Sequence, residues 1–119
     1  MSIFASDAVE GVLHTALNGI SYRQDVIADN IANVDTPNFR ARSVDFETSL
    51  KAAISRGGVG AGGVSIDVMP TDTPVGINGN NVDLRKESMA AMQSTFQYQI
   101  VSRSVTERLN NMRTAAGSF

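Results

Sequence analysis

Residues 30–42 read NIANVDTPNFRAR, and this stretch decides the fold because it ends a long helical pattern and turns the chain. Pro37 cannot donate a backbone N–H to a continuing helix, and it disfavours helical geometry at Thr36. Asn33 and Asp35 have short side chains that bond to nearby backbone and tolerate left-handed geometry. We therefore expect a helix to end near Asn33 to Asp35 and a hinge to follow.

Upstream of this stretch, apolar residues recur with helical spacing from about Ala5 to Asn33. The steps alternate between four and three residues, as in a coiled-coil seam, and the seam consists of Leu13, Leu17, Ile20, Gln24, Ile27, Ile31 and Val34. Gly11 and Gly19 lie within this helix, and each costs about 1 kcal/mol relative to Ala. Such a helix needs support from packing against another element.

A second helical pattern covers about Asp83 to Ala116, with Asp83 as the expected N-cap and Glu87 in the first turn. Its apolar residues form a wide stripe that drifts around the helix: Met89, Met92, Phe96, Ile100, Val101, Val105, Leu109 and Met112. One partner helix cannot cover a stripe of this width. Part of the stripe should therefore face another surface.

The middle of the chain predicts short elements. Asp45 could cap a brief helix over Phe46 to Ile54, and the glycine-rich segment 57–63 is expected to be a mobile linker. Alternation of Val64, Ile66 and Val68 predicts a short half-buried strand that ends at Met69-Pro70, with a second extended piece at Val75 and Ile77. A two-stranded ribbon is marginally stable alone, so we expect an exposed strand here to pair with a neighbouring molecule.

These patterns predict a mainly α protein in which two long terminal helices pack as an antiparallel coiled-coil hairpin. The expected segments are an N-terminal coiled-coil helix at 1–35, a hinge with a Gly-rich loop and short extended segments at 36–82, and a C-terminal helix at 83–119. Both ends form one domain. A lone two-helix hairpin exposes most of its surface, so the chain should complete its core by stacking against other subunits.

Charge is distributed unevenly along the 119 residues, whose net charge is −2. Residues 1–35 carry five carboxylates against one arginine, whereas residues 83–119 carry five cations against three carboxylates. The two ends should therefore attract each other. The acidic balance argues against nucleic acid as a partner.

No set of residues typical of catalysis or metal binding is present. The chain has no Cys and a single His, His14, and the glycine run lacks the Lys-Ser/Thr that follows it in a phosphate loop. The carboxylates are too scattered for a calcium loop or for acid–base work. We expect no enzyme activity, no cofactor and no metal. The start of the chain does not look like a cleavable signal, and no apolar run is long enough to span a membrane.

Three segments together resemble the flagellar rod and hook family. The first is the pattern of Ala28, Asn30, Ile31, Ala32, Asn33, Thr36, Pro37 and Phe39; the others are Val44-Asp45-Phe46 and Gly79-Asn80-Asn81-Val82-Asp83-Leu84, which favour basal-body rod members. Residues of about 55–75 carry no specific match. The family usually has Gly-Tyr after the proline, where this chain has Asn38-Phe39. Asn is the best replacement for Gly where φ is positive, so the turn should be kept.

The resemblance implies a structural subunit of the proximal rod, in the periplasm beside the MS ring, exported by the flagellar type III apparatus without signal cleavage. Implied partners are copies of itself, rod proteins of the FlgC, FlgF and FlgG types, the rod adapter FliE, the MS-ring protein FliF and the export gate, with no membrane insertion. The assembly interface would comprise Leu13, Leu17, Ile20, Ile27, Ile31, Met92, Phe96, Val101, Val105, Leu109 and Met112. The hinge motif would comprise Asn30, Asn33, Asp35, Thr36, Pro37, Phe39, Asp45, Phe46, Gly79, Asn80, Val82 and Asp83. Phe39 and Phe46 would fix the hinge segment against a neighbour.

Two alternatives remain open from the sequence. A related proximal rod protein of the FlgC type would differ only in its position in the rod, and the segments after the hinge argue against it. A soluble helical adaptor or export chaperone would instead be a discrete, stable dimer.

Overall fold

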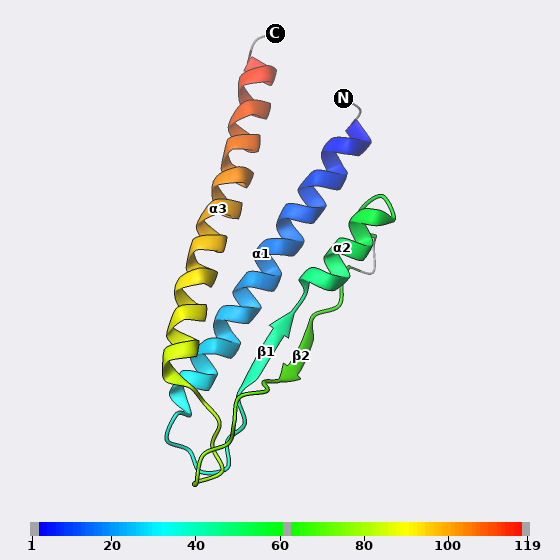
Figure 1. Ribbon diagram of the computed structural model, residues 1–119. Helices are drawn as coiled ribbons and strands as arrows, with labels where there is room; N and C mark the ends of the chain where they lie inside the picture. Colours follow the sequence, from blue (N-terminus) through cyan, green and yellow to red (C-terminus); the bar gives the residue numbers. More distant parts are fainter. Residues whose placement is uncertain (1–2, 61–62, 118–119) are drawn as a thin grey trace.

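The computed structural model describes residues 3–60 and 63–117, which form an elongated molecule of 66 × 27 × 15 Å. Along the chain the elements are α1 (Ile3–Ala32), β1 (Arg42–Asp45), α2 (Glu47–Ser55), β2 (Asp67–Pro70) and α3 (Leu84–Gly117). The two long helices run antiparallel, and the short elements lie between them in the chain (Figure 1). The predicted mainly α fold with two long terminal helices is confirmed.

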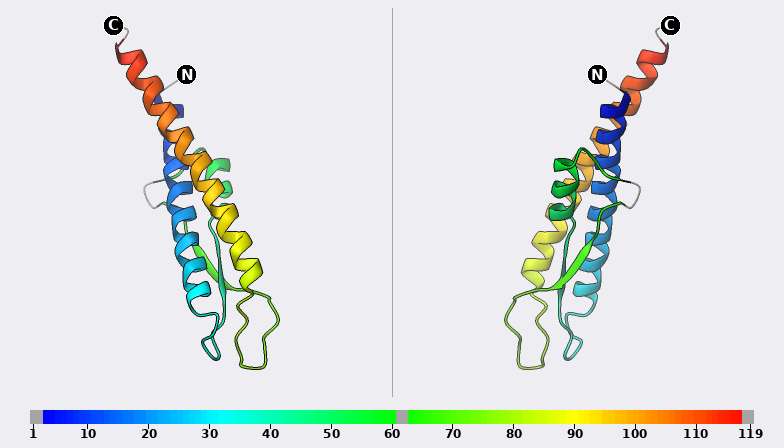
Figure 2. Two further views of the ribbon diagram at one scale, coloured as in Figure 1. Left: turned by 90° about the vertical axis from the view of Figure 1, so that its left-hand side faces the viewer. Right: turned by 90° about the vertical axis from the view of Figure 1, so that its right-hand side faces the viewer.

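Helix α1 is the central element of the molecule. It contacts α3 on one side and the arm formed by β1, β2 and α2 on the other (Figures 1 and 2). The last turns of α3 extend past the start of α1 (Figure 2). Within residues 3–60 and 63–117, no helix is both long and apolar enough to cross a membrane.

The turn after α1 follows the sequence prediction closely. The helix ends at Ala32, one residue before the predicted range, and the Asn33 side chain donates to the Asp29 carbonyl at 2.8 Å. Thr36 Oγ1 donates to Asn33 Oδ1 at 3.0 Å. Asn38 has a φ of 64°, so Asn does take the left-handed position that the family pattern gives to Gly.

The strands pair with each other inside the chain. β1 and β2 are antiparallel, with Val44 opposite Val68 and Asp45 opposite Asp67. β1 therefore supplies one partner of β2 inside the chain, and pairing of the other edge of β2 with a neighbouring molecule stays a prediction. Strand β2 begins later than predicted and is exposed along its length. Residues 75–77 form no second strand.

Helix α2 begins and ends as its sequence directs. Asp45 Oδ1 accepts from the Thr48 N–H at 3.1 Å and its Oδ2 accepts from Thr48 Oγ1 at 2.7 Å, which confirms the predicted cap. At the other end, Gly57 and Gly58 have φ of 103° and 142°, and the Gly58 N–H donates to the Ala53 carbonyl at 3.0 Å. The first two glycines therefore end a helix rather than belonging to a featureless linker.

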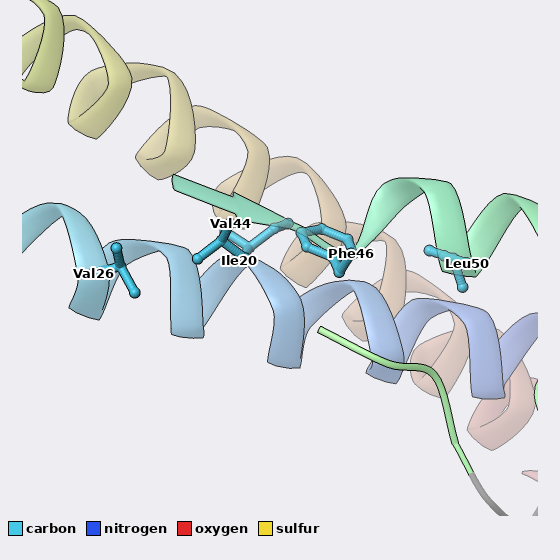
Figure 3. Close-up of a cluster of buried hydrophobic side chains, with 5 residues drawn as sticks. All are labelled: Ile20, Val26, Val44, Phe46 and Leu50. Carbon is cyan, nitrogen blue, oxygen red and sulfur yellow. The ribbon is translucent and has the colours of Figure 1, made fainter. Parts of the chain in front are cut away.

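The core lies between α1 and the arm. Ile20 and Val26 from α1, Val44 from β1, Leu50 from α2 and Phe46, the residue just before α2, form one buried cluster (Figure 3). A Cβ added at Gly19 would lie 2.3 Å from Phe46 Cγ, so only glycine lets the ring lie against the helix. Phe46 is 3% exposed, so the prediction that it contacts a neighbouring molecule is wrong: it packs inside its own chain.

Candidate assembly interface

Helix α1 carries two seams side by side. Gln24, Ile27 and Ile31 of the predicted seam line a cavity together with Ala91 and Thr95 of α3, so this part of the seam faces α3. Of the other predicted seam residues, Ile20 is buried, and Leu13 and Leu17 are half-buried.

The second seam faces the arm and was missed in the sequence. Its residues repeat with the same steps of four and three, one position before the first seam: Val12, Ala16, Gly19, Arg23, Val26 and Asn30. The signal was present as spacing, but four of these six residues are small or polar. Their apolar character alone could not mark a buried face.

Helix α3 turns its small residues inward and its large apolar residues outward. Ser94 is 1% exposed, and Ala90, Ala91, Val101 and Val105 are half-buried on the same face. On the opposite face lie four large side chains that are 61–70% exposed, which we call the outer stripe: Met89, Met92, Phe96 and Ile100. Residues 88–102 contain no charged residue, so the outer stripe has no charge within its own length.

The predicted interface residues of α3 therefore fall into two groups. Val101 and Val105 lie on the inward face, and Val101 packs against the core cluster. Met92, Phe96, Leu109 and Met112 are exposed, at 70%, 67%, 42% and 52%. The stripe is too wide for one partner helix, as its sequence indicates.

Four asparagines join the two long helices at the hinge end, and we call this set the asparagine junction: Asn30, Asn33, Asn80 and Asn81. Asn80 Nδ2 donates to the carbonyls of Asn33 and Thr36, both at 2.8 Å, and its Oδ1 accepts from the Val82 N–H at 2.7 Å. One side chain thereby ties the end of α1 to the residues that precede α3.

Asn30 and Asn81 hold the first residues of β1. Asn30 is 0% exposed; its Nδ2 donates to the Arg42 carbonyl at 2.8 Å and its Oδ1 accepts from the Arg42 N–H at 3.1 Å. Asn81 Oδ1 accepts from the Ala41 N–H at 2.6 Å. Asn30 therefore pairs with the edge of β1 that β2 leaves open, as another strand would.

Gly79 fits the junction for two reasons. Its φ is 79°, and a Cβ added there would lie 2.2 Å from Asn38 Oδ1. The Asn38 N–H donates to the Asn78 carbonyl at 3.0 Å, which brings the two turns together. The turn around Asn38 and the Gly79 to Asp83 segment are far apart in sequence, but they form one site in the structure.

The remaining residues of the predicted hinge motif have simpler roles. Asp83 Oδ1 accepts from the Lys86 N–H at 3.2 Å, which confirms it as the cap of α3. Asp35, Thr36 and Pro37 are exposed, and Phe39 is half-buried.

Among the described residues, no group of three or more His, Cys, Asp or Glu is placed to hold a metal.

Arg23 is the main charged group of the arm contact. It donates to Glu47 Oε2 at 2.8 Å and to the Val44 carbonyl at 2.7 Å, and its guanidinium lies 4.9 Å from the centre of the Phe46 ring. Partial burial of Glu47 raises the pKa of its carboxyl, but the hydrogen bonds and charge of Arg23, together with hydrogen bonds from the Glu47 and Phe46 backbone, outweigh burial, and the pKa lies below its usual 4.5. Hydrogen bonds from the Thr48 N–H and hydroxyl lower the pKa of Asp45 below 3.8.

Comparison with known proteins agrees with this geometry. Residues 12–40, which include most of α1 and the turn, match the family described as "Flagella basal body rod protein". The FlgB protein of Bacillus subtilis (strain 168) is 33% identical over 96% of this chain and 95% of its own length. FlgB of Salmonella typhimurium is 31% identical over 79% of this chain and 82% of its own, and FlgB of Escherichia coli K12 is 29% identical over 89% and 91%. Because the likeness runs through nearly the whole of both chains in the first comparison, this protein belongs to the FlgB family of flagellar basal body rod proteins.

Proposed function

We propose that this chain is a structural subunit of the proximal rod, where it links the MS ring and export apparatus to the distal rod and transmits torque. Membership of the FlgB family supports the basal body as its location. The observation that carries the proposal is the outer stripe, because it presents to solvent the large apolar residues that a finished helical protein would bury.

The outer stripe is long enough for a specific contact. From Met89 to Ile100 it runs for about 17 Å along the helix, at about 1.5 Å per residue. Contiguous apolar surface without charges is uncommon on monomers and is typical of protein–protein contacts. Met side chains also adapt to partners of different shape, which suits a subunit that meets more than one kind of neighbour.

A second apolar surface lies on the other edge of the molecule. Val9, Val12 and Leu13 of α1, Ile54 of α2 and Gly58 line a shallow cavity of about 290 Å³ with little polar surface. The outer stripe belongs to α3 and this cavity to α1 and α2, and α1 lies between α3 and α2 (Figure 1). Contacts between two different surfaces of identical chains give rings or open helical assemblies, whereas self-complementary contacts give closed dimers. The arrangement therefore favours a rod subunit over a dimeric adaptor.

The proposed partners are further copies of the chain, rod proteins of the FlgC, FlgF and FlgG types, FliE, FliF and the export gate. We also propose that the chain travels through the flagellar type III apparatus as an unfolded polypeptide. Its small core supports this route, because the described residues include eight buried apolar residues, two of them alanines. So small a core is easily unfolded.

The test is a charge placed in the outer stripe. Phe96→Glu should abolish association of the purified chain in sedimentation velocity and should stop rod assembly and swimming in the bacterium that carries it. Thr106→Glu is the matched control, because Thr106 is exposed on the same helix about 80° around from Phe96. A compact dimer that forms equally well with Phe96→Glu would favour the adaptor and refute the proposal.

A further inference from the structure

A cavity of about 420 Å³ opens between α1, the strands and the first turns of α3. Part of its wall is apolar and is formed by Val26, Ile27, Val44 and Ala90. Glu87 also lines it, one turn after the start of α3. A carboxylate in such surroundings is unusual, because burial removes it from water.

Glu87 is 5% exposed and has no side-chain partner among the residues that the structure describes. The cations on the same wall are already engaged with other carboxylates, in the pairs Arg23–Glu47, Arg42–Asp29 and Lys86–Asp72. None of these three cations forms an ion pair with Glu87 within the described chain. Of the two carboxylates that line the cavity, Asp72 is paired with Lys86 and Glu87 has no ion pair among the described residues.

We propose that this cavity is a socket for a basic side chain of a second copy of the chain, and that Arg113 supplies it. The aliphatic stem of an arginine would lie against Val26, Ile27 and Ala90, and its guanidinium would donate to both oxygens of Glu87. The inference rests on the proposed assembly between copies and adds to it a specific contact.

The end of α3 is the part of the chain suited to reach the socket. Residues 109–117 are all exposed, and they belong to the turns that extend past the start of α1 (Figures 1 and 2). Arg113 lies in this segment and forms no ion pair within the described residues. The socket lies by the first turns of α3, toward the other end of the 66 Å molecule, so stacking end to end brings the two together.

Charge agrees with this pairing of ends. Residues 103–117 carry three arginines and one glutamate, whereas residues 25–35 of α1 and the following turn, at the socket end, carry three aspartates and no cation. Opposite charges on two surfaces steer their association and fix its register.

The test compares Glu87→Gln and Arg113→Gln in the full chain. Each should weaken association of the purified protein by about 30-fold or more, since each leaves the other charge without its partner. The two together should cost little more than either alone, and exchanging the charges with Glu87→Arg and Arg113→Glu should restore part of the affinity. Arg56→Gln is the control, because Arg56 is another exposed cation, at the end of α2.

Stability of the dilute chain gives a second readout. If Glu87 waits for a partner, Glu87→Gln should leave the unfolding midpoint unchanged or raise it, because it removes an unpaired buried charge. A lower midpoint would mean that Glu87 serves the fold itself and would overturn the socket. Unchanged association in both Gln variants, with Phe96→Glu still disruptive, would overturn the socket and leave the proposed function standing; an inert Phe96→Glu would refute the proposed function itself.

Discussion

Replacing Gly19 by Ala should destabilise the protein, although Ala is the better helix former. The added Cβ would lie 2.3 Å from Cγ and 2.4 Å from Cδ1 of Phe46, more than 1 Å inside ordinary contact. Phe46 is 3% exposed and cannot move without disturbing the core cluster, so the overpacking cost should reach about 3 kcal/mol, the upper end of the usual range. The gain in helix propensity returns about 1 kcal/mol. The expected net loss is about 2 kcal/mol.

Gly11→Ala is the matched control on the same helix. The nearest atom to its new Cβ would be Val59 Cβ at 3.9 Å, which is ordinary contact. This variant should therefore gain the full propensity term of about 1 kcal/mol. The two Gly→Ala variants should differ by about 3 kcal/mol, which corresponds to about 1–3 M in the urea midpoint followed by circular dichroism at 222 nm.

A third variant checks the cause. In a Phe46→Leu background the shorter side chain leaves room for the methyl group, so Gly19→Ala should lose at least about 1 kcal/mol less there than in the original chain. Equal upward shifts of the midpoint in Gly11→Ala and Gly19→Ala would refute the reasoning, because they would mean that the ring does not lie against Gly19.

Three further results are expected. Asn30→Ala should lower the free energy of unfolding by about 1–3 kcal/mol, because it leaves the Arg42 N–H and carbonyl unpaired at a partly buried site, and hydrogen exchange should show faster exchange of the Arg42 amide. The contribution of Glu47 should be complete above pH 4.5 and be lost as pH falls through its lower folded-state pKa, so acid titration of stability should be flatter in Arg23→Gln. Gly79→Ala should lower the thermal midpoint, because alanine disfavours the positive φ of this position and its Cβ would clash with Asn38. An unchanged midpoint would contradict the close approach of Asn38 to Gly79.

The elements that could be predicted from the sequence depend on local chemistry. The helix end before Pro37, the left-handed Asn38 and the caps formed by Asp45 and Asp83 all follow from residues within a few positions of one another. The long helices follow from repeated spacing. Such features need no knowledge of the rest of the fold.

The elements that were missed depend on partners far along the chain. Strand β1 has little strand character of its own, and it forms because Asn30 and β2 pair with its two edges. Phe46 was expected to contact a neighbouring molecule, because the sequence does not reveal its partner inside the chain, the helix backbone at Gly19. The width of the apolar stripe on α3 indicated that one partner could not cover it, but not that the small face around Ser94 would lie nearest α1. Sequence spacing identifies a face but not which partner covers it.

The asparagine junction has a consequence for the conditions that the protein can tolerate. Its side chains are carboxamides, which neither gain nor lose a proton at any pH that a bacterium meets, and hydrogen bonds between neutral groups are little affected by dissolved ions. High salt would weaken the Arg23–Glu47 and Arg42–Asp29 contacts, and acidification would weaken the Arg23–Glu47 contact, while the hydrogen bonds that join α1 to the residues before α3 would stay intact. The part of the molecule that holds its two long helices in register is thus the part least sensitive to the surrounding medium.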